Sequence, residues 1–161
     1  MSDILRVGVL GSGLMGGGIA QVAAVAGYDT VVRDVTQPIL DKAKAGIDKS
    51  LAKFVEKGKL PAADRDGALK RLSFTTATAD LKSCDIVVEA VTEDLEVKNA
   101  LWKELDTLCG TGTIFASNTS SLTIAAMAAA TKRPDRFVGL HFFNPVPLMQ
   151  LVEVVRTVTT S

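Results

Sequence analysis

Short apolar runs alternate with longer segments in which apolar residues recur at helical spacing. The apolar runs predict strands over residues 6–10, 29–33, 72–75, 85–89, 114–117, 136–140 and 151–155. Runs of this length and composition are typical of strands buried on both faces. The helical spacing predicts helices over residues 16–26, 36–58, 61–69 and 123–130, and from Asp94 to Leu108.

Strands and helices that alternate in this way predict an α/β fold. The expected architecture is a doubly wound, mainly parallel sheet with helices on both faces and right-handed crossovers. A chain of 161 residues suits one domain, so residues 1–161 are expected to form a single unit. In such a sheet, ligands bind at the carboxyl ends of the strands, where the strand order reverses.

The first predicted strand runs into Gly11-Ser12-Gly13-Leu14-Met15-Gly16. This G-x-G-x-x-G pattern suits a Rossmann-type turn, in which Gly11 allows the tight bend, Gly13 a close approach of pyrophosphate, and Gly16 close helix packing. Asp34 ends the next strand, where an acid binds the hydroxyls of the adenosine ribose. The pattern therefore predicts dinucleotide binding and favours NAD over NADP, although Arg33 beside Asp34 argues weakly the other way.

Composition excludes several other classes of protein. The 18 basic and 18 acidic residues balance, so no nucleic-acid partner is expected. No apolar run reaches the ~20 residues of a membrane span, and a strand starting at residue 6 leaves no room for a targeting peptide. Cys84 and Cys109 have no metal or redox spacing and are expected to be buried in a reducing compartment. The expectation is a cytoplasmic protein without a metal.

Polar residues follow two strands of the second half. Asn118, Thr119, Ser120 and Ser121 come directly after one strand, either as a simple turn with a helix cap or as part of a ligand site. Glu93 and Lys98 begin the helix after another strand, which suits either helix charge complementarity or contact with a cofactor. Asp94 and Lys98 are also spaced as an i,i+4 ion pair.

The only histidine lies in an unusual segment. His141 follows the strand at residues 136–140 and precedes two prolines, so it is placed at the predicted ligand edge of the sheet. Glu153 stands among apolar residues of the last strand, where a carboxylate is costly unless it is paired. His141 is the expected partner of Glu153.

The helix at residues 36–58 has a basic face. Ser50, Lys53 and Lys57 fall at i, i+3 and i+7 on the side opposite the apolar residues. Because acidic residues are interspersed, an ordinary solvated face is the simpler interpretation. The alternative is contact with a polyanionic substrate group.

Four stretches together resemble the N-terminal NAD-binding domain of the L-3-hydroxyacyl-CoA dehydrogenase family, which includes 3-hydroxybutyryl-CoA dehydrogenases. They cover residues 9–16, 88–93, 116–122 and 139–147, and the likeness runs from Arg6 to the last residue. The last two stretches are the most specific. The resemblance implies oxidation of 3-hydroxyacyl-CoA to 3-oxoacyl-CoA, or the reverse reduction, in fatty-acid β-oxidation or butanoate metabolism.

The resemblance also implies roles for matching residues. His141 would be the general base, Glu153 its orienting carboxylate, and Ser120 a hydrogen-bond donor to the reacting oxygen. Ser50, Lys57 and Ser120 would contact the acyl-CoA substrate. The implied contacts to NAD are Gly11, Ser12, Gly13, Leu14, Met15, Gly16, Asp34, Ala90, Val91, Glu93, Lys98, Ser120 and Asn144.

Members of this family continue into the rest of the nucleotide domain and a helical domain that forms their homodimer interface. Residues 1–161 are therefore expected to be a nucleotide domain that stops before its last elements, binds NAD and turns over substrate poorly. Two other functions stay open from the sequence. One is an NAD-binding module without turnover, and the other is a related dehydrogenase acting on a sugar acid.

Overall fold

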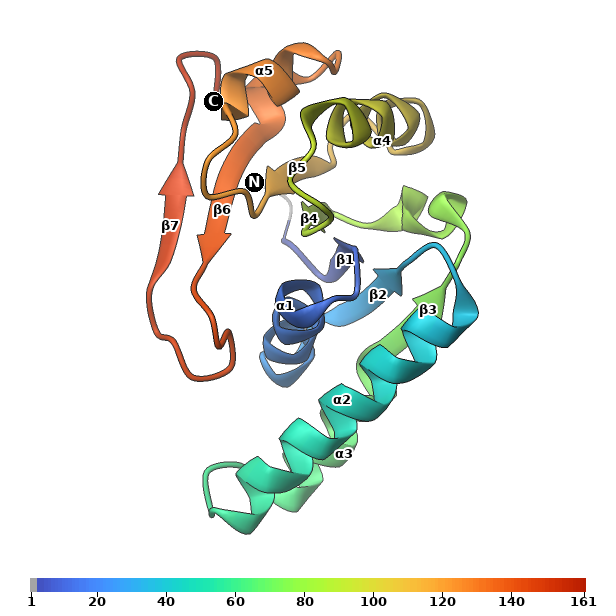
Figure 1. The fold of residues 1–161 in the computed structure, drawn as a ribbon, viewed down its shortest axis with the longest axis vertical. Coiled ribbons are helices and arrows are strands. Elements are labelled where there is room, and N and C mark those ends of the chain that lie inside the picture. Colours follow the sequence, from blue (N-terminus) through green and yellow to red (C-terminus); the bar gives the residue numbers. More distant parts are fainter. Residues whose placement is uncertain (1–2) are drawn as a thin grey trace.

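A seven-stranded sheet forms the centre of the molecule (Figure 1). The computed structural model describes residues 3–161. The strand order is β3-β2-β1-β4-β5-β6-β7; the first six strands are parallel, and β7 is antiparallel to β6. The strands are β1 (Arg6–Leu10), β2 (Asp29–Arg33), β3 (Leu72–Thr75), β4 (Ile86–Glu89), β5 (Ile114–Ser117), β6 (Phe137–Phe142) and β7 (Val152–Val155).

Helices cover both faces of the sheet, and each face has its own apolar core. One core is closed by α1 (Leu14–Val25), α2 (Gln37–Glu56) and α3 (Ala62–Arg71). The other is closed by the short 3-10 helix η1 (Thr78–Ser83), α4 (Leu95–Leu108) and α5 (Ile124–Ala129). A second 3-10 turn, η2 (Pro134–Arg136), precedes β6. Figure 1 shows α2 and α3 side by side, extending beyond the sheet.

The alternation of side chains along the strands builds these two cores. Val9 of β1 packs in the first core, and its neighbour Leu10 packs in the second. Three aromatic rings lie at the centre of the second core. The centroid of the Trp102 ring lies 5.0 Å from the ring centroid of Phe115 and 4.9 Å from that of Phe137. Since successive residues of a strand face opposite sides, continuous apolar runs are what a doubly covered sheet requires.

The strand order reverses between β1 and β4, and two backbone segments meet there. Gly11, after β1, has φ of +94°, and a Cβ placed on it would lie 2.7 Å from the carbonyl oxygen of Ala90, which follows β4. A Cβ on Gly16 would lie 1.8 Å from the carbonyl oxygen of Gly11. Glycine is therefore required at both positions, as the sequence pattern predicts.

The predicted fold class is confirmed, with some differences in the elements. The strand carrying His141 is longer than predicted and runs to Phe142, because antiparallel pairing with β7 continues the ladder through His141. Helix η1 was not expected from the pattern.

Cys84 and Cys109 are free and buried, as predicted, and burial raises the pKa of the Cys84 thiol to about 11. None of the helices within residues 3–161 is long and apolar enough to cross a membrane.

Candidate active site

The glycine turn leaves space in front of the first helix. A Cβ built on Gly13 meets no atom within 4 Å, although Gly13 is the N-cap of α1. The first N–H groups of a helix have no acceptor within it, and the helix dipole makes this end positive. The turn therefore fits a pyrophosphate group, as in dinucleotide sites of this geometry.

Asp34 lies directly beside this turn. Its Oδ2 accepts hydrogen bonds from the backbone N and the Oγ of Ser12, both at 2.7 Å, and its Oδ1 accepts from the backbone N of Val35. Partial burial raises the pKa of Asp34, but these hydrogen bonds and the charge of Arg33 outweigh it. The net pKa lies below the usual value of 3.8, so the carboxylate is ionised at neutral pH and suits ribose hydroxyls.

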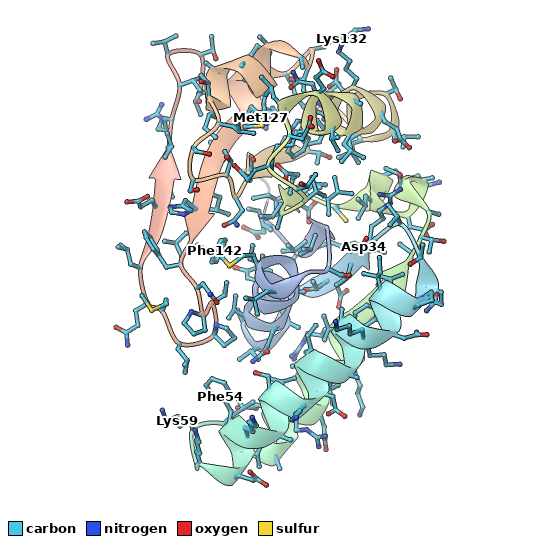
Figure 2. All side chains as sticks on the ribbon, viewed as in Figure 1. Asp34, Phe54, Lys59, Met127, Lys132 and Phe142 are labelled. Atoms are coloured by element: carbon cyan, nitrogen blue, oxygen red, sulfur yellow. The ribbon has the colours of Figure 1, made fainter. Side chains whose placement is uncertain are left out.

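A cleft of about 720 Å³ runs from the glycine turn along α2. The chain between β6 and β7 closes its other side, where Val146 packs on Gly18 of α1. Figure 2 labels Phe54 and Lys59, which line the cleft toward the far end of α2. Residues of several predicted sites meet here: Ser12, Gly13, Leu14, Ser50, Lys53, Lys57 and Asn144. Lys53 and Lys57 are exposed, as a solvated face requires, but the face also borders the cleft, so both interpretations of the α2 face stay open.

His141 and Glu153 form the predicted pair. They are directly opposite in the β6–β7 ladder, and His141 Nδ1 lies 2.9 Å from Glu153 Oε2. An ionised carboxylate can only accept, so Nδ1 carries the proton and the free lone pair of the neutral ring lies on Nε2. The expectation that Glu153 is buried and therefore needs a partner was wrong, because β7 is an edge strand and the Glu153 side chain is 53% exposed.

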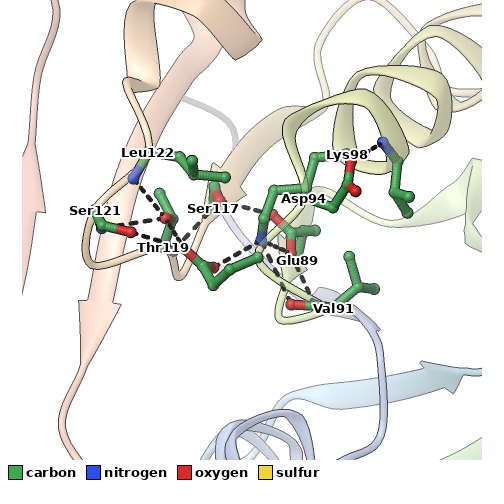
Figure 3. A network of polar contacts seen from close by, with 10 residues as sticks. Glu89, Val91, Asp94, Lys98, Ser117, Thr119, Ser121 and Leu122 are labelled. Carbon is green, nitrogen blue, oxygen red and sulfur yellow. Dashed lines mark hydrogen bonds and ion pairs between the residues drawn. The ribbon is translucent and has the colours of Figure 1, made fainter.

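A polar network joins the segments that follow β4 and β5 (Figure 3). Its centre is Lys98, whose side chain is 1% exposed and whose Nζ lies 2.5 Å from Glu89 Oε1 and 3.1 Å from Glu93 Oε1. The predicted Asp94–Lys98 side-chain pair does not form. Asp94 instead caps α4 by accepting from the backbone N of Val97 at 3.0 Å, since it precedes the helix by one residue.

The same network fixes the polar residues after β5. Glu93 Oε2 accepts from Thr119 Oγ1 at 2.6 Å and from Ser121 Oγ at 3.2 Å. Partial burial raises the pKa of Glu93, but the bonds from Thr119, Lys98 and Ser121 and the charge of Lys98 bring the net pKa below its usual value of 4.5. Ser120 lies between the two bonded residues and is exposed.

The Ser120 segment is also tied to the strand of His141. The side-chain Oδ1 of Asn118 accepts from the backbone N of Phe142 at 2.8 Å. Ser120 and His141 therefore belong to neighbouring segments at one edge of the sheet, whereas neither borders the cleft beside α2. Within residues 3–161, no group of three His, Cys, Asp or Glu side chains could hold a metal ion.

Sequence reasoning missed two parts of this arrangement. The buried Glu89 and its partner Ser117, whose Oγ donates to Glu89 Oε2 at 2.6 Å, were not expected at the site. Lys42 and Lys59 border the cleft and were not singled out either. An acidic residue ending an otherwise apolar strand was the available signal for Glu89, because such a carboxylate requires partners.

Comparisons with known proteins agree with these features. Residues 6–161 match the 3-hydroxyacyl-CoA dehydrogenase, NAD binding domain. A probable 3-hydroxybutyryl-CoA dehydrogenase of Deinococcus radiodurans is 53% identical over 98% of this chain and 56% of its own length. The mitochondrial hydroxyacyl-coenzyme A dehydrogenase of Sus scrofa is 52% identical over 98% of this chain and 52% of its own length.

A solved structure shows the same fold. The (S)-3-hydroxybutyryl-CoA dehydrogenase of Ralstonia eutropha superposes with a TM-score of 0.96 and 46% identity, covering 99% of this chain and 56% of that one. The chain spans about half the length of the curated relatives it matches. The glycine turn, Asp34 and these matches lead to one conclusion: the chain belongs to the 3-hydroxyacyl-CoA dehydrogenase family and corresponds to its NAD-binding domain.

Proposed function

We propose that this protein takes part in the NAD-dependent oxidation of a 3-hydroxyacyl-CoA to a 3-oxoacyl-CoA, or in the reverse reduction. The observation that carries the proposal is the contact of 2.9 Å between His141 Nδ1 and Glu153 Oε2. An imidazole that donates from Nδ1 to a carboxylate can act as a general base through Nε2. The family of the chain supports the same reaction.

In the proposed oxidation, His141 Nε2 removes the proton of the substrate 3-hydroxyl. Glu153 stabilises the imidazolium that forms and keeps the ring oriented. Ser120 donates a hydrogen bond to the oxygen as it becomes a carbonyl. Bound NAD would supply the hydride acceptor, so that the substrate would lose its hydroxyl proton to His141 and a hydride from C3 to the cofactor. The reverse reduction uses the same groups.

We assign the cofactor contacts to the turn at residues 11–16, to Asp34, and to the segments after β4, β5 and β6. The open space at Gly13 supports a pyrophosphate position there, and the ionised Asp34 supports binding of the ribose hydroxyls. Ala90, Val91, Glu93, Ser120 and Asn144 would then lie toward the nicotinamide. Lys98 would act from behind this surface, because its side chain is buried against Glu89 and Glu93.

We assign the coenzyme A handle of the substrate to the cleft beside α2. Ser50 and Lys57 border it, together with Lys42, Lys53 and Lys59. A cluster of lysines next to an apolar cleft suits the phosphates and the pantetheine arm of coenzyme A. A sugar acid carries neither the phosphates nor the pantetheine arm that suit this cleft, so the cleft favours an acyl-CoA substrate.

The proposal treats residues 1–161 as one NAD-binding domain and places the protein in the cytoplasm. Two free, buried thiols support a reducing compartment. Cell fractionation with an antibody against the chain tests this location. Recovery in an oxidising compartment or in a membrane fraction would contradict it.

The experiment that tests the function is a turnover assay on the purified chain with acetoacetyl-CoA and NADH, followed by NADH absorbance. Consumption of NADH that requires the acyl-CoA supports the proposal. Binding of NADH without turnover, in this chain and in a version extended to the length of its relatives, would reduce the protein to a binding module. Turnover of a sugar acid in place of acetoacetyl-CoA would reassign the substrate.

A further inference from the structure

The proposed reaction leaves the most buried carboxylate of the site without a role. Glu89 ends strand β4, and its side chain is 0% exposed. Its carboxylate accepts from Lys98 Nζ at 2.5 Å, Ser117 Oγ at 2.6 Å and the backbone N of Val91 at 2.8 Å. These donors come from α4, from β5 and from the segment after β4. One carboxylate thus joins three separate parts of the chain at the edge where the strand order reverses.

The links from Glu89 reach both segments that border the proposed nicotinamide position. Residues 90–94 are held through Val91, whose carbonyl oxygen also lies 3.5 Å from Lys98 Nζ. Residues 118–122 are held through Ser117, whose Oγ accepts from the backbone N of Thr119 at 3.4 Å. The backbone oxygen of Glu89 also accepts from the backbone N of Asn118 at 2.8 Å.

A second route to the Ser120 segment runs through charge. Lys98 is shared between Glu89 and Glu93, and Glu93 in turn accepts from the hydroxyls of Thr119 and Ser121. Figure 3 shows this chain of contacts from Lys98 to the Ser121 segment. If Glu89 loses its charge, the buried ammonium keeps Glu93 as its one ionised partner. Glu93 is then drawn inward, away from the two hydroxyls on either side of Ser120.

We propose that Glu89 is a positioning residue that fixes the Ser120 hydroxyl at the reacting end of the site. It acts through Ser117 on one route and through Lys98 and Glu93 on the other. The proposal rests on the function assigned above for the role of Ser120, whereas the connection between Glu89 and residues 118–122 rests on the contacts alone. A misplaced hydroxyl weakens the stabilisation of the reacting oxygen and thereby lowers kcat.

The test compares Glu89→Gln with Asp106→Asn. Asp106 is a matched control, because its carboxylate is also buried and paired with a cation. Its side chain is 7% exposed, its Oδ1 lies 2.6 Å from Arg133 Nε, and it lies toward the other end of α4. Glu89→Gln is expected to lower kcat by about 10- to 100-fold with little change in KM, since small misplacements have effects of this size. Asp106→Asn is expected to lower the stability and leave kcat of the folded protein unchanged.

A double-mutant cycle with Ser120→Ala separates positioning from a general structural effect. If Glu89 acts through Ser120, Glu89→Gln causes no further loss of kcat in the Ser120→Ala background. Multiplying losses would overturn the proposal, and so would a kcat for Glu89→Gln equal to that of Asp106→Asn. Should Glu89→Gln not fold, Glu89→Asp takes its place, because it keeps the charge but shortens the side chain.

Hydrogen exchange distinguishes a failure of this proposal from a failure of the proposed function. If neither this chain nor the version extended to the length of its relatives shows turnover, the proposed function is wrong, and the exchange rates of the amides at residues 118–122 decide the role of Glu89. Glu89→Gln is then expected to speed exchange in this segment relative to Asp106→Asn, measured at denaturant concentrations that give equal global stability. Equal exchange rates in both variants would overturn the positioning role.

Discussion

At the scale of single residues, hydrogen bonds orient His141 and lower the pKa of Asp34. Glu153 fixes the tautomer of His141, and Ser12 and Val35 keep Asp34 ionised. Both arrangements consist of hydrogen bonds within the chain itself. These bonds orient the proposed base and the proposed ribose-binding carboxylate.

Replacing His141 with Ala removes the proposed base. We expect kcat for acetoacetyl-CoA reduction to fall about 10²- to 10⁴-fold, the usual contribution of a general acid or base, with NADH affinity little changed. Glu153→Gln keeps the shape of the orienting group and should give a smaller loss together with a changed pH profile. Steady-state kinetics and NADH fluorescence titration measure the two quantities, and near-normal kcat in His141→Ala would remove His141 from the mechanism.

Asp34 gives the stability a dependence on pH. Its folded pKa lies below 3.8, so its ionised form stabilises the fold above pH 3.8, and this contribution is lost as the pH falls through the folded pKa. Asp34→Asn should therefore destabilise the chain at pH 7, and the difference from the unaltered chain should shrink toward pH 3. Urea unfolding across this range measures it. A difference that stays constant with pH would contradict the lowered pKa.

At the scale of elements, the sequence predicts those parts that follow from local chemistry. The apolar runs predict the seven strands, because the central ones bury both faces, and the glycines predict the turn before α1. Partner choice between distant polar groups was predicted less well. Lys98 pairs with Glu89 instead of Asp94, since the start of α4 turns its side chain into the sheet. Burial of this kind depends on tertiary packing, which spacing along one helix does not contain.

Helix α2 offers a test of the proposed coenzyme A cleft. Lys57 borders the cleft, whereas Lys49 is exposed on the same helix and is not among the residues lining it. We expect Lys57→Ala to raise KM for acetoacetyl-CoA severalfold and to have little effect on a short thioester without the nucleotide, since only the former carries phosphates. Lys49→Ala serves as the control for lost positive charge. If the two variants have equal effects, α2 contributes only long-range electrostatic attraction and does not contact the coenzyme A group.

At the scale of the whole molecule, one sheet carries two cores. Helices α1, α2 and α3 close one of them, and the other contains the single tryptophan, Trp102, which is 0% exposed. The five strands β1, β2, β4, β5 and β6 contribute residues to both cores. Neither core can be lost without disrupting the strands that support the other, so the chain should unfold as one cooperative unit.

The single tryptophan makes this cooperativity measurable. Leu51 is 1% exposed in the core opposite Trp102, and Leu51→Ala should cost about 2–5 kcal/mol of unfolding free energy. The Trp102 fluorescence transition in urea should shift by the same amount as the far-ultraviolet circular dichroism transition. If Trp102 fluorescence keeps its original midpoint while circular dichroism shifts, the two cores unfold separately.

The position of the proposed catalytic pair in the β6–β7 ladder separates two properties of the protein. His141 faces Glu153 because Leu140 pairs with Val154 and Phe142 with Val152, so backbone register alone fixes their separation. The connection at residues 143–151 joins the two strands, and part of it also supplies one wall of the cleft beside α2. Replacements that keep the length of this connection can therefore reshape the cleft while the proposed proton-transfer pair keeps its place in the ladder. Under the proposed function, substrate preference can then vary separately from acid–base chemistry.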